Sequence, residues 1–198
     1  MTPILTYFLR AAMQTVRNPR EGARQVMAVQ MERRARWEVL LLIAVLSAIL
    51  AYFSVFVGAF TNSSAAQYPV TLNPIMLGFS QLIVMLVMVF AMHLIGNWAG
   101  GYGDLDDAIL LVAWMQFILI CLQVAQILAV VFFPVLALLL GLAGLVLVFV
   151  LLTFFVAELH GFKSMPGVFF SVLFVMLILA TFIRFVFSLF GFDIIGVI

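Results

Sequence analysis

The sequence predicts an all-α polytopic membrane protein: a compact bundle of five transmembrane helices preceded by one or two cytoplasmic amphipathic helices. Composition is the first reason, because 67% of the 198 residues are hydrophobic and only 9% are charged, whereas a soluble domain carries about 25% charged residues. The second reason is that five apolar runs reach the roughly 20 residues that a helix needs to cross a bilayer. These observations exclude a water-soluble enzyme, a disordered chain and a nucleic-acid-binding module.

Residues 1–37 form a basic arm, which contains seven of the nine basic residues. Apolar side chains recur every four positions from Ile4 to Val16 with arginines on the opposite face, a pattern typical of an amphipathic helix in the lipid interface. Asn18 and Pro19 then fit the cap and the first residue of a second helix. We expect the arm to bind anionic lipid, and the alternative is a helix that docks on a protein partner. The candidate residues are Arg10, Arg17, Arg20, Arg24, Arg33, Arg34 and Arg36.

Residues 38–198 form the transmembrane domain, with spans predicted at about residues 39–60, 74–95, 108–132, 134–157 and 166–190. Lipid offers the backbone no hydrogen bonds and the runs show no polar–apolar alternation, so these spans are helices rather than barrel strands. Pro74, Pro134 and Pro166 suit the first turn of a helix, and only Phe133 and Pro134 separate the third and fourth spans, which predicts a tight helical hairpin. The arginines directly before the first span place the N-terminus in the cytoplasm, and five spans then place the C-terminus on the opposite side.

Polar side chains inside the spans form a candidate intramembrane cluster. Three glutamines of the third span lie seven and three positions apart, roughly on one face of that helix. We expect the cluster to form hydrogen bonds between helices, and the alternative is that it lines a path for a transported species or a ligand. For the arginine of the fifth span, a further alternative is that its side chain extends to the outer interface. The cluster consists of Gln81, Gln116, Gln123, Gln126 and Arg184.

A second polar cluster lies at the predicted cytoplasmic ends of the spans. Histidines near carboxylates suggest a metal site or a proton relay, but Glu158 and His160 lack the i, i+4 spacing of ligands on a helix. Aspartates at the start of the third span have a structural role, since they cap a helix N-terminus and oppose its dipole. We therefore expect no metal, no cofactor and no catalytic activity. The cluster consists of His93, Asp104, Asp106, Asp107, Glu158 and His160.

Two motifs and the topology together resemble a known family. An Asn-Pro-Arg-Glu motif at residues 18–21 lies in the arm, and a glycine-rich turn leads into the third span at Gly100, Gly101, Tyr102 and Gly103. With a basic N-terminus and five spans, the chain resembles the bacterial branch of the Yip domain family, five-span membrane proteins whose eukaryotic members interact with Rab/Ypt GTPases. The acidic-leucine-tyrosine-glycine-proline motif of the eukaryotic members is absent, so we do not carry over GTPase binding. The resemblance implies a protein of the bacterial inner membrane that organises the membrane or binds partners.

For the function, we expect a non-enzymatic scaffold, accessory subunit or membrane organiser that binds lipid and other membrane proteins or further copies of itself. The alternative is a small transporter or channel component, in which the intramembrane glutamines and Arg184 line a polar path. The sequence shows no internal repeat of the kind found in many transporters, which favours the scaffold.

Overall fold

The computed structural model describes the backbone of residues 3–60 and 74–189, and the side chains of residues 4–58 and 74–181. In this part of the chain every regular element is a helix, as the sequence predicts. The helices are, in order, α1 (Pro3–Arg17), α2 (Pro19–Met27), α3 (Arg33–Phe60), α4 (Pro74–Trp98), α5 (Leu105–Phe132), α6 (Pro134–His160) and α7 (Met165–Leu189). The predicted outer loop after the first span lies outside the described residues.

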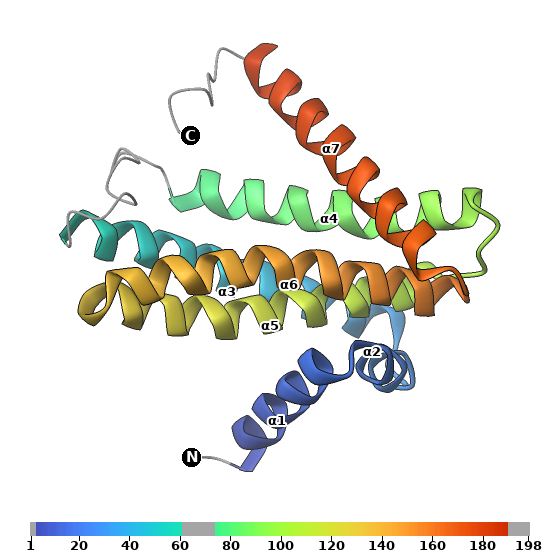
Figure 1. Ribbon diagram of the computed structural model, residues 1–198, viewed down its shortest axis with the longest axis horizontal. Coiled ribbons are helices and arrows are strands. Elements are labelled where there is room, and N and C mark those ends of the chain that lie inside the picture. The colour runs from blue at the N-terminus through green and yellow to red at the C-terminus, as the bar shows by residue number, and fades with distance from the viewer. Residues whose placement is uncertain (1–2, 61–73, 190–198) are drawn as a thin grey trace.

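The helices α3, α4, α5 and α6 run side by side along the long axis of the molecule (Figure 1). Within this bundle α5 is central, because it packs against α3, α4 and α6. Its first half is accordingly the most buried part of the chain, and Ile109 and Leu111 have no exposed surface. On one flank α7 packs against α6 and then diverges from α4, and on the other flank α1 and α2 form the arm (Figure 1).

Four helices, α3 to α6, are long and apolar enough to cross a membrane. They have between 25 and 28 residues, which corresponds to about 38–42 Å at about 1.5 Å per residue, compared with about 30 Å for the hydrocarbon core. In α7 the described side chains add an apolar helix over Met165–Thr181. The chain is therefore an integral membrane protein, and the count of five spans stays a prediction.

All four bundle helices extend beyond the predicted spans at the same end of the bundle. Instead of residues 39, 95, 108 and 157, the helices begin or end there at Arg33, Trp98, Leu105 and His160. The reason is that hydropathy locates the outermost strongly apolar residue of a span, whereas the residues that cap each helix lie beyond it at this end of the bundle. We call this end of the bundle, where α2 packs, the arm end.

Capping glycines and an aspartate define the helix boundaries at the arm end. Gly100 has a φ of +86°, and the N–H of Gly101 donates to the carbonyl of Gly96 at 3.0 Å, which together close α4 as a Schellman motif. Gly161, with a φ of +71°, ends α6 in the same left-handed conformation. The carboxylate of Asp104 accepts a hydrogen bond from the first N–H of α5 at 2.7 Å.

The predicted hairpin between the third and fourth spans is confirmed. A single non-helical residue, Phe133, separates α5 from α6, and Pro134 begins α6 because its missing N–H needs no partner there. The two helices then pack closely along their length, where Gly141 lies against the side chain of Gln126 and Gly144 against Leu122. A β-carbon at either glycine would come within 3.0 Å of its neighbour, so small residues at this seam allow the close approach of the two helices.

Candidate functional site at the arm end

The arm packs on the chain's own bundle. α2 contacts α6 and α5, and α1 contacts α2 and the side of α5; in Figure 1 α2 is seen nearly end-on below the right-hand end of the bundle. Two small residues of the arm, Ala12 and Ala23, are buried in the same hydrophobic core as the first half of α5. The sequence suggested lipid or a partner as the surface that the arm binds, and the structure adds a third surface, the bundle itself.

A part-buried hydrogen bond and an aromatic cluster attach α1 to α5. The indole N–H of Trp114 donates to the hydroxyl of Thr15 at 3.1 Å, and this hydroxyl donates to the carbonyl of Ala11 at 3.0 Å. The ring of Phe8 packs against Trp114 and Phe117, with centroid distances of 6.3 and 6.0 Å. Because the hydroxyl of Thr15 both donates and accepts, no polar atom of this contact is left unpaired.

The turn between α1 and α2 is close-packed. Gly22 in α2 lies directly over Thr15 in α1, and a β-carbon on the glycine would overlap the threonine side chain. Asn18 and Pro19 take the cap and first-residue positions of α2 that the sequence predicts. The arm is thus two closely packed helices that meet at an angle, with one buried face (Figure 1).

Three ion pairs join the arginines of the arm to the acidic ends of the bundle helices. Arg33 binds both carboxylate oxygens of Asp106 at 3.0 and 3.1 Å, and Arg36 donates to Asp107 at 3.0 Å. The third pair joins α2 to the last turn of α6 through Arg24 and Glu158. The structure therefore brings the two predicted sets, the basic arm and the cytoplasmic-end carboxylates, into direct contact.

These ion pairs differ in how far their side chains are exposed to solvent. The side chain of Arg36 is only 14% exposed, and its Nε also donates to the carbonyl of Met31 at 3.1 Å. Arg24 is solvated, and the hydrogen bond and charge of Glu158 raise the pKa of its guanidinium above the ordinary value. Solvated pairs contribute little to stability, so apolar contacts hold α1 and α2 on the bundle. The pair of Arg24 with Glu158 adds a specific contact between α2 and α6, whereas those of Arg33 and Arg36 join α3 to α5 within the bundle.

The remaining arm arginines have different neighbours. Arg34 pairs with Glu38 on its own helix at 2.9 Å, and Arg20 lies over the ring of Phe154, 5.9 Å from its centroid. Arg10 and Arg17 on α1 are exposed and, within the described part of the chain, have no carboxylate partner. They lie on the face of α1 that the core does not use.

His160 is enclosed by the glycine-rich turn. Its Nδ1 accepts a hydrogen bond from the N–H of Gly103 at 3.0 Å, and its Nε2 lies 2.9 Å from the carbonyl of Met92. Nδ1 accepts and a carbonyl can only accept, so the ring is the neutral tautomer that carries its proton on Nε2. A β-carbon at Gly96, Gly101 or Gly103 would overlap the histidine side chain. The absence of a side chain at these three glycines therefore leaves the space that the imidazole occupies.

The sequence missed this arrangement because it depends on contacts between separate helix ends. The available signal was the number of glycines around residues 96–103, where only Gly100 is needed for its backbone conformation.

The other candidate residues at the arm end do not form a site with His160. In the glycine-rich turn Tyr102 is 95% exposed, and Trp98 is exposed as well. His93 lies beside the amide of Asn97 on its own helix, with 3.4 Å between the nitrogens. Among the described residues, no group of three or more His, Cys, Asp or Glu side chains is arranged to hold a metal.

The intramembrane glutamines have different neighbours. Gln116 donates to the hydroxyl of Ser47 on α3 at 3.0 Å, while Gln126 lies against Gly141 on α6. Gln81 and Gln123 are half-buried. The side chain of Arg184 lies outside the described residues.

A comparison with protein families identifies the chain. The Yip1 domain matches residues 13–185. The chain belongs to the Yip1 domain family. This match confirms the family that the motifs suggested, and it begins within α1, so the shared domain includes most of the arm as well as the bundle. No curated protein and no solved structure matches the chain.

Proposed function

We propose that this Yip1 domain protein is a non-enzymatic membrane scaffold or accessory subunit, which binds other membrane proteins and lipid through the outer face of its docked arm. The observation that carries the proposal is that the arm is folded against the bundle and leaves Arg10 and Arg17 exposed on α1. An arm fixed in this way presents its basic face at a constant height relative to the membrane. Such a face suits anionic lipid headgroups and acidic segments of partner proteins.

The proposed orientation places the arm end in the cytoplasm of a bacterial cell, at the inner membrane. Arginines flank the start of α3, and basic residues are enriched on the cytoplasmic side of membrane proteins. Exposed aromatic side chains at the same end, Trp98 and Tyr102, are of the type that lies at the membrane–water interface. Both features support one placement of the bundle in the bilayer.

A role without catalysis is supported by the structural contacts that the acidic and histidine side chains at the arm end make. The carboxylates at the arm end pair with arginines of the arm, and His160 is enclosed by backbone. A transporter or channel component remains the alternative. In the described part of the chain, Gln116 and Gln126 face different helices rather than a shared path, which favours the scaffold.

The test is to extract the native protein in nanodiscs and identify by mass spectrometry the proteins and lipids that accompany it. A double variant, Arg10→Glu with Arg17→Glu, reverses the charge of the exposed face, and Gln25→Glu on exposed α2 is the matched control. We expect the double variant to lose the accompanying membrane proteins and the anionic lipid that the arm binds, while the control retains them. An unchanged set of partners and lipids in the double variant contradicts the proposal.

A further inference from the structure

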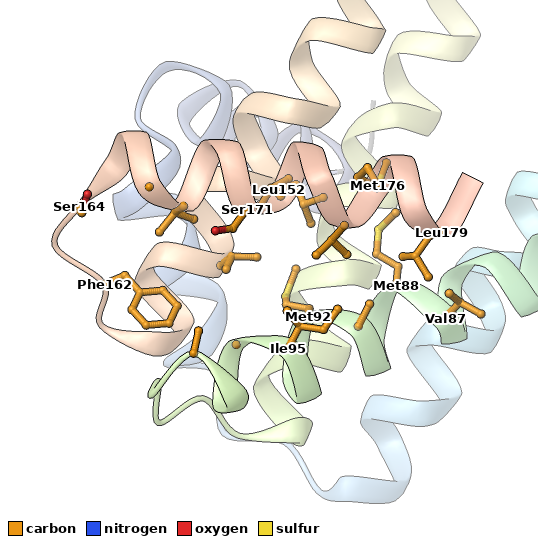
Figure 2. Close-up of a pocket in the computed structure, with 18 of the residues that line it drawn as sticks. Val87, Met88, Met92, Ile95, Leu152, Phe162, Ser164, Ser171, Met176 and Leu179 are labelled. Atoms are coloured by element: carbon orange, nitrogen blue, oxygen red, sulfur yellow. The ribbon is translucent and has the colours of Figure 1, made fainter. Parts of the chain in front are cut away.

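A groove runs between α4 and α7 on the flank opposite the arm, with α6 as its floor. It has a volume of about 470 Å³, within the range of about 300–1,000 Å³ for ligand pockets. Figure 2 shows side chains of α4 and α7 turned into the same space, with Phe162 and Ser164 at one end and Val87 and Leu179 toward the other. Most of the lining is aliphatic or methionine, so the groove suits hydrocarbon rather than water.

The arm end of the groove has two polar residues in its lining. Lys163 and Ser164, in the turn between α6 and α7, lie at this end, and Ser171 follows two turns along α7. Lys163 is the single lysine of the chain, and no carboxylate in the described part of the chain pairs with it. A lysine offers three donors and a positive charge. The groove thus combines an apolar interior with a cationic end at the membrane interface.

The dimensions decide between a helix and a lipid chain. The groove follows α4 from Val84 to just beyond the end of the helix at Ala99, a length of about 22 Å at about 1.5 Å per residue. A helix about 10–12 Å across would occupy roughly 1,700–2,500 Å³ over that length. The empty space at the groove is about 1380 Å³ and includes open solvent, so the groove is too small to enclose a helix, and its apolar lining suits a single hydrocarbon chain.

We propose that this groove binds one acyl chain of an anionic phospholipid, whose phosphate is held at the arm end by the ammonium of Lys163 and the hydroxyl of Ser164. Charge complementarity selects the anionic headgroup, and the aliphatic walls hold the chain. A lipid in the groove also fills the space between α4 and α7, which have little direct contact over the described residues. The proposal is independent of whether the arm binds other membrane proteins.

The groove is continuous with the histidine contact at the arm end. Met92 and Gly96 line it, and both also contact His160, whose ring packs against Phe162 at a centroid distance of 5.6 Å. The lipid site is therefore built on the part of the fold that the glycine-rich turn holds rigid. Its headgroup end, in contrast, is an exposed turn.

The first experiment uses phosphatidylglycerol with a photoactivatable diazirine in its acyl chain. The full-length protein is reconstituted in phosphatidylethanolamine vesicles that contain a small fraction of this probe, irradiated and digested. We expect labelling concentrated on the inward faces of α4 and α7, at residues such as Met88, Met92 and Met176. Labelling spread evenly over the bilayer-facing surfaces of α3, α5 and α6 overturns the proposal.

The second experiment separates headgroup from chain by native mass spectrometry of lipid retained on the purified protein. For Lys163→Gln we expect about fivefold weaker retention of phosphatidylglycerol, the factor for one basic residue near an anionic surface, and unchanged retention of phosphatidylethanolamine. For Ser171→Phe, which places a ring in the groove, we expect loss of both lipids. The matched control is Leu177→Phe, an exposed position on α7 outside the groove, which retains both.

A second variant keeps the test conclusive if Ser171→Phe fails to fold. Ala91→Phe fills the groove from the opposite wall on α4 and gives the same loss of lipid if Ser171→Phe does not accumulate. An unchanged preference for phosphatidylglycerol in Lys163→Gln contradicts the proposed headgroup contact. If Ser171→Phe converts a dimer to a monomer without changing the retained lipid, the groove is an interface between copies of the chain and the lipid proposal is wrong.

Discussion

The two flanks of the bundle are held in different ways. On one flank the arm packs through apolar contacts, and specific polar contacts are added to them, namely the Trp114–Thr15 hydrogen bond and the ion pair of Arg24 with Glu158. On the other flank α7 packs against α6 and leaves an apolar groove open toward α4. Polar contacts have preferred partners and geometry, whereas apolar contacts in lipid have little directional preference. The comparison shows that one flank is specified by the chain itself and the other is suited to a lipid.

The contact between His160 and its glycines joins the two flanks, so its disruption has the largest expected effect. Gly96→Ala introduces a β-carbon that overlaps the imidazole, and overpacking of this kind typically costs about 1–3 kcal/mol. Displacement of the ring also breaks its two buried hydrogen bonds. We expect a markedly lower unfolding temperature in detergent, measured by circular dichroism.

The control for this substitution lies in the same turn. A side chain at Gly100 would meet nothing within 4 Å, and asparagine tolerates the left-handed conformation better than other side chains. Gly100→Asn is therefore expected to leave the unfolding temperature nearly unchanged. An equal decrease in the unfolding temperature of both variants would contradict our interpretation. It would show that glycine is required in the turn for its backbone conformation and not for the space that it leaves to the imidazole.

The second effect concerns the attachment of α1. Thr15→Val removes the acceptor of the Trp114 indole N–H in a part-buried contact, and an unpaired donor costs up to about 1–3 kcal/mol when it is fully buried. We expect the arm to detach more often and to become sensitive to trypsin, while the bundle stays folded. The matched control is Thr181→Val on α7, where the hydroxyl bonds only to Leu177 of its own helix. Equal protection of the arm in both variants would contradict this account.

The smallest effect concerns the ion pairs. Arg24→Gln removes the solvated ion pair between α2 and Glu158 of α6, for which only a small contribution is expected, and Arg34→Gln removes only a pair within α3. We expect a modest increase in the trypsin sensitivity of the arm for Arg24→Gln and none for Arg34→Gln. In the wild type the same sensitivity should increase with salt, because ions screen exposed pairs. No dependence on salt and no difference between the variants would assign the docking to apolar contacts alone.

The features that could be predicted from the sequence are the local ones. Helix starts at Pro74 and Pro134, the cap at Asn18 and the hairpin at Phe133 follow from the conformations that neighbouring residues allow. The apolar runs predict the bundle helices because length and hydropathy alone determine a span. The family was likewise predicted from short motifs and topology, and the match over residues 13–185 confirms it.

The features that could not be predicted depend on which helices are neighbours. Arg24 and Glu158 are 134 positions apart, and their pairing follows only from the position of α2 on α6. The spacing of the intramembrane glutamines suggested one face, but α5 is surrounded by neighbours, so Gln116 and Gln126 meet different helices. The groove between α4 and α7 had no sequence signal, because its lining residues are the same aliphatic types that face the bilayer elsewhere.

The most direct measurement asks whether the arm docks on the bundle in a membrane. Arg24→Lys keeps the charge and gives an amine that a carbodiimide can couple to Glu158 in membrane vesicles, and Arg17→Lys, exposed on α1, is the control. Docking of the arm predicts a cross-linked peptide between α2 and α6 for Arg24→Lys and none between α1 and α6 for Arg17→Lys. Absence of the α2–α6 cross-link, or equal cross-linking of the two variants, would show that the arm lies away from the bundle.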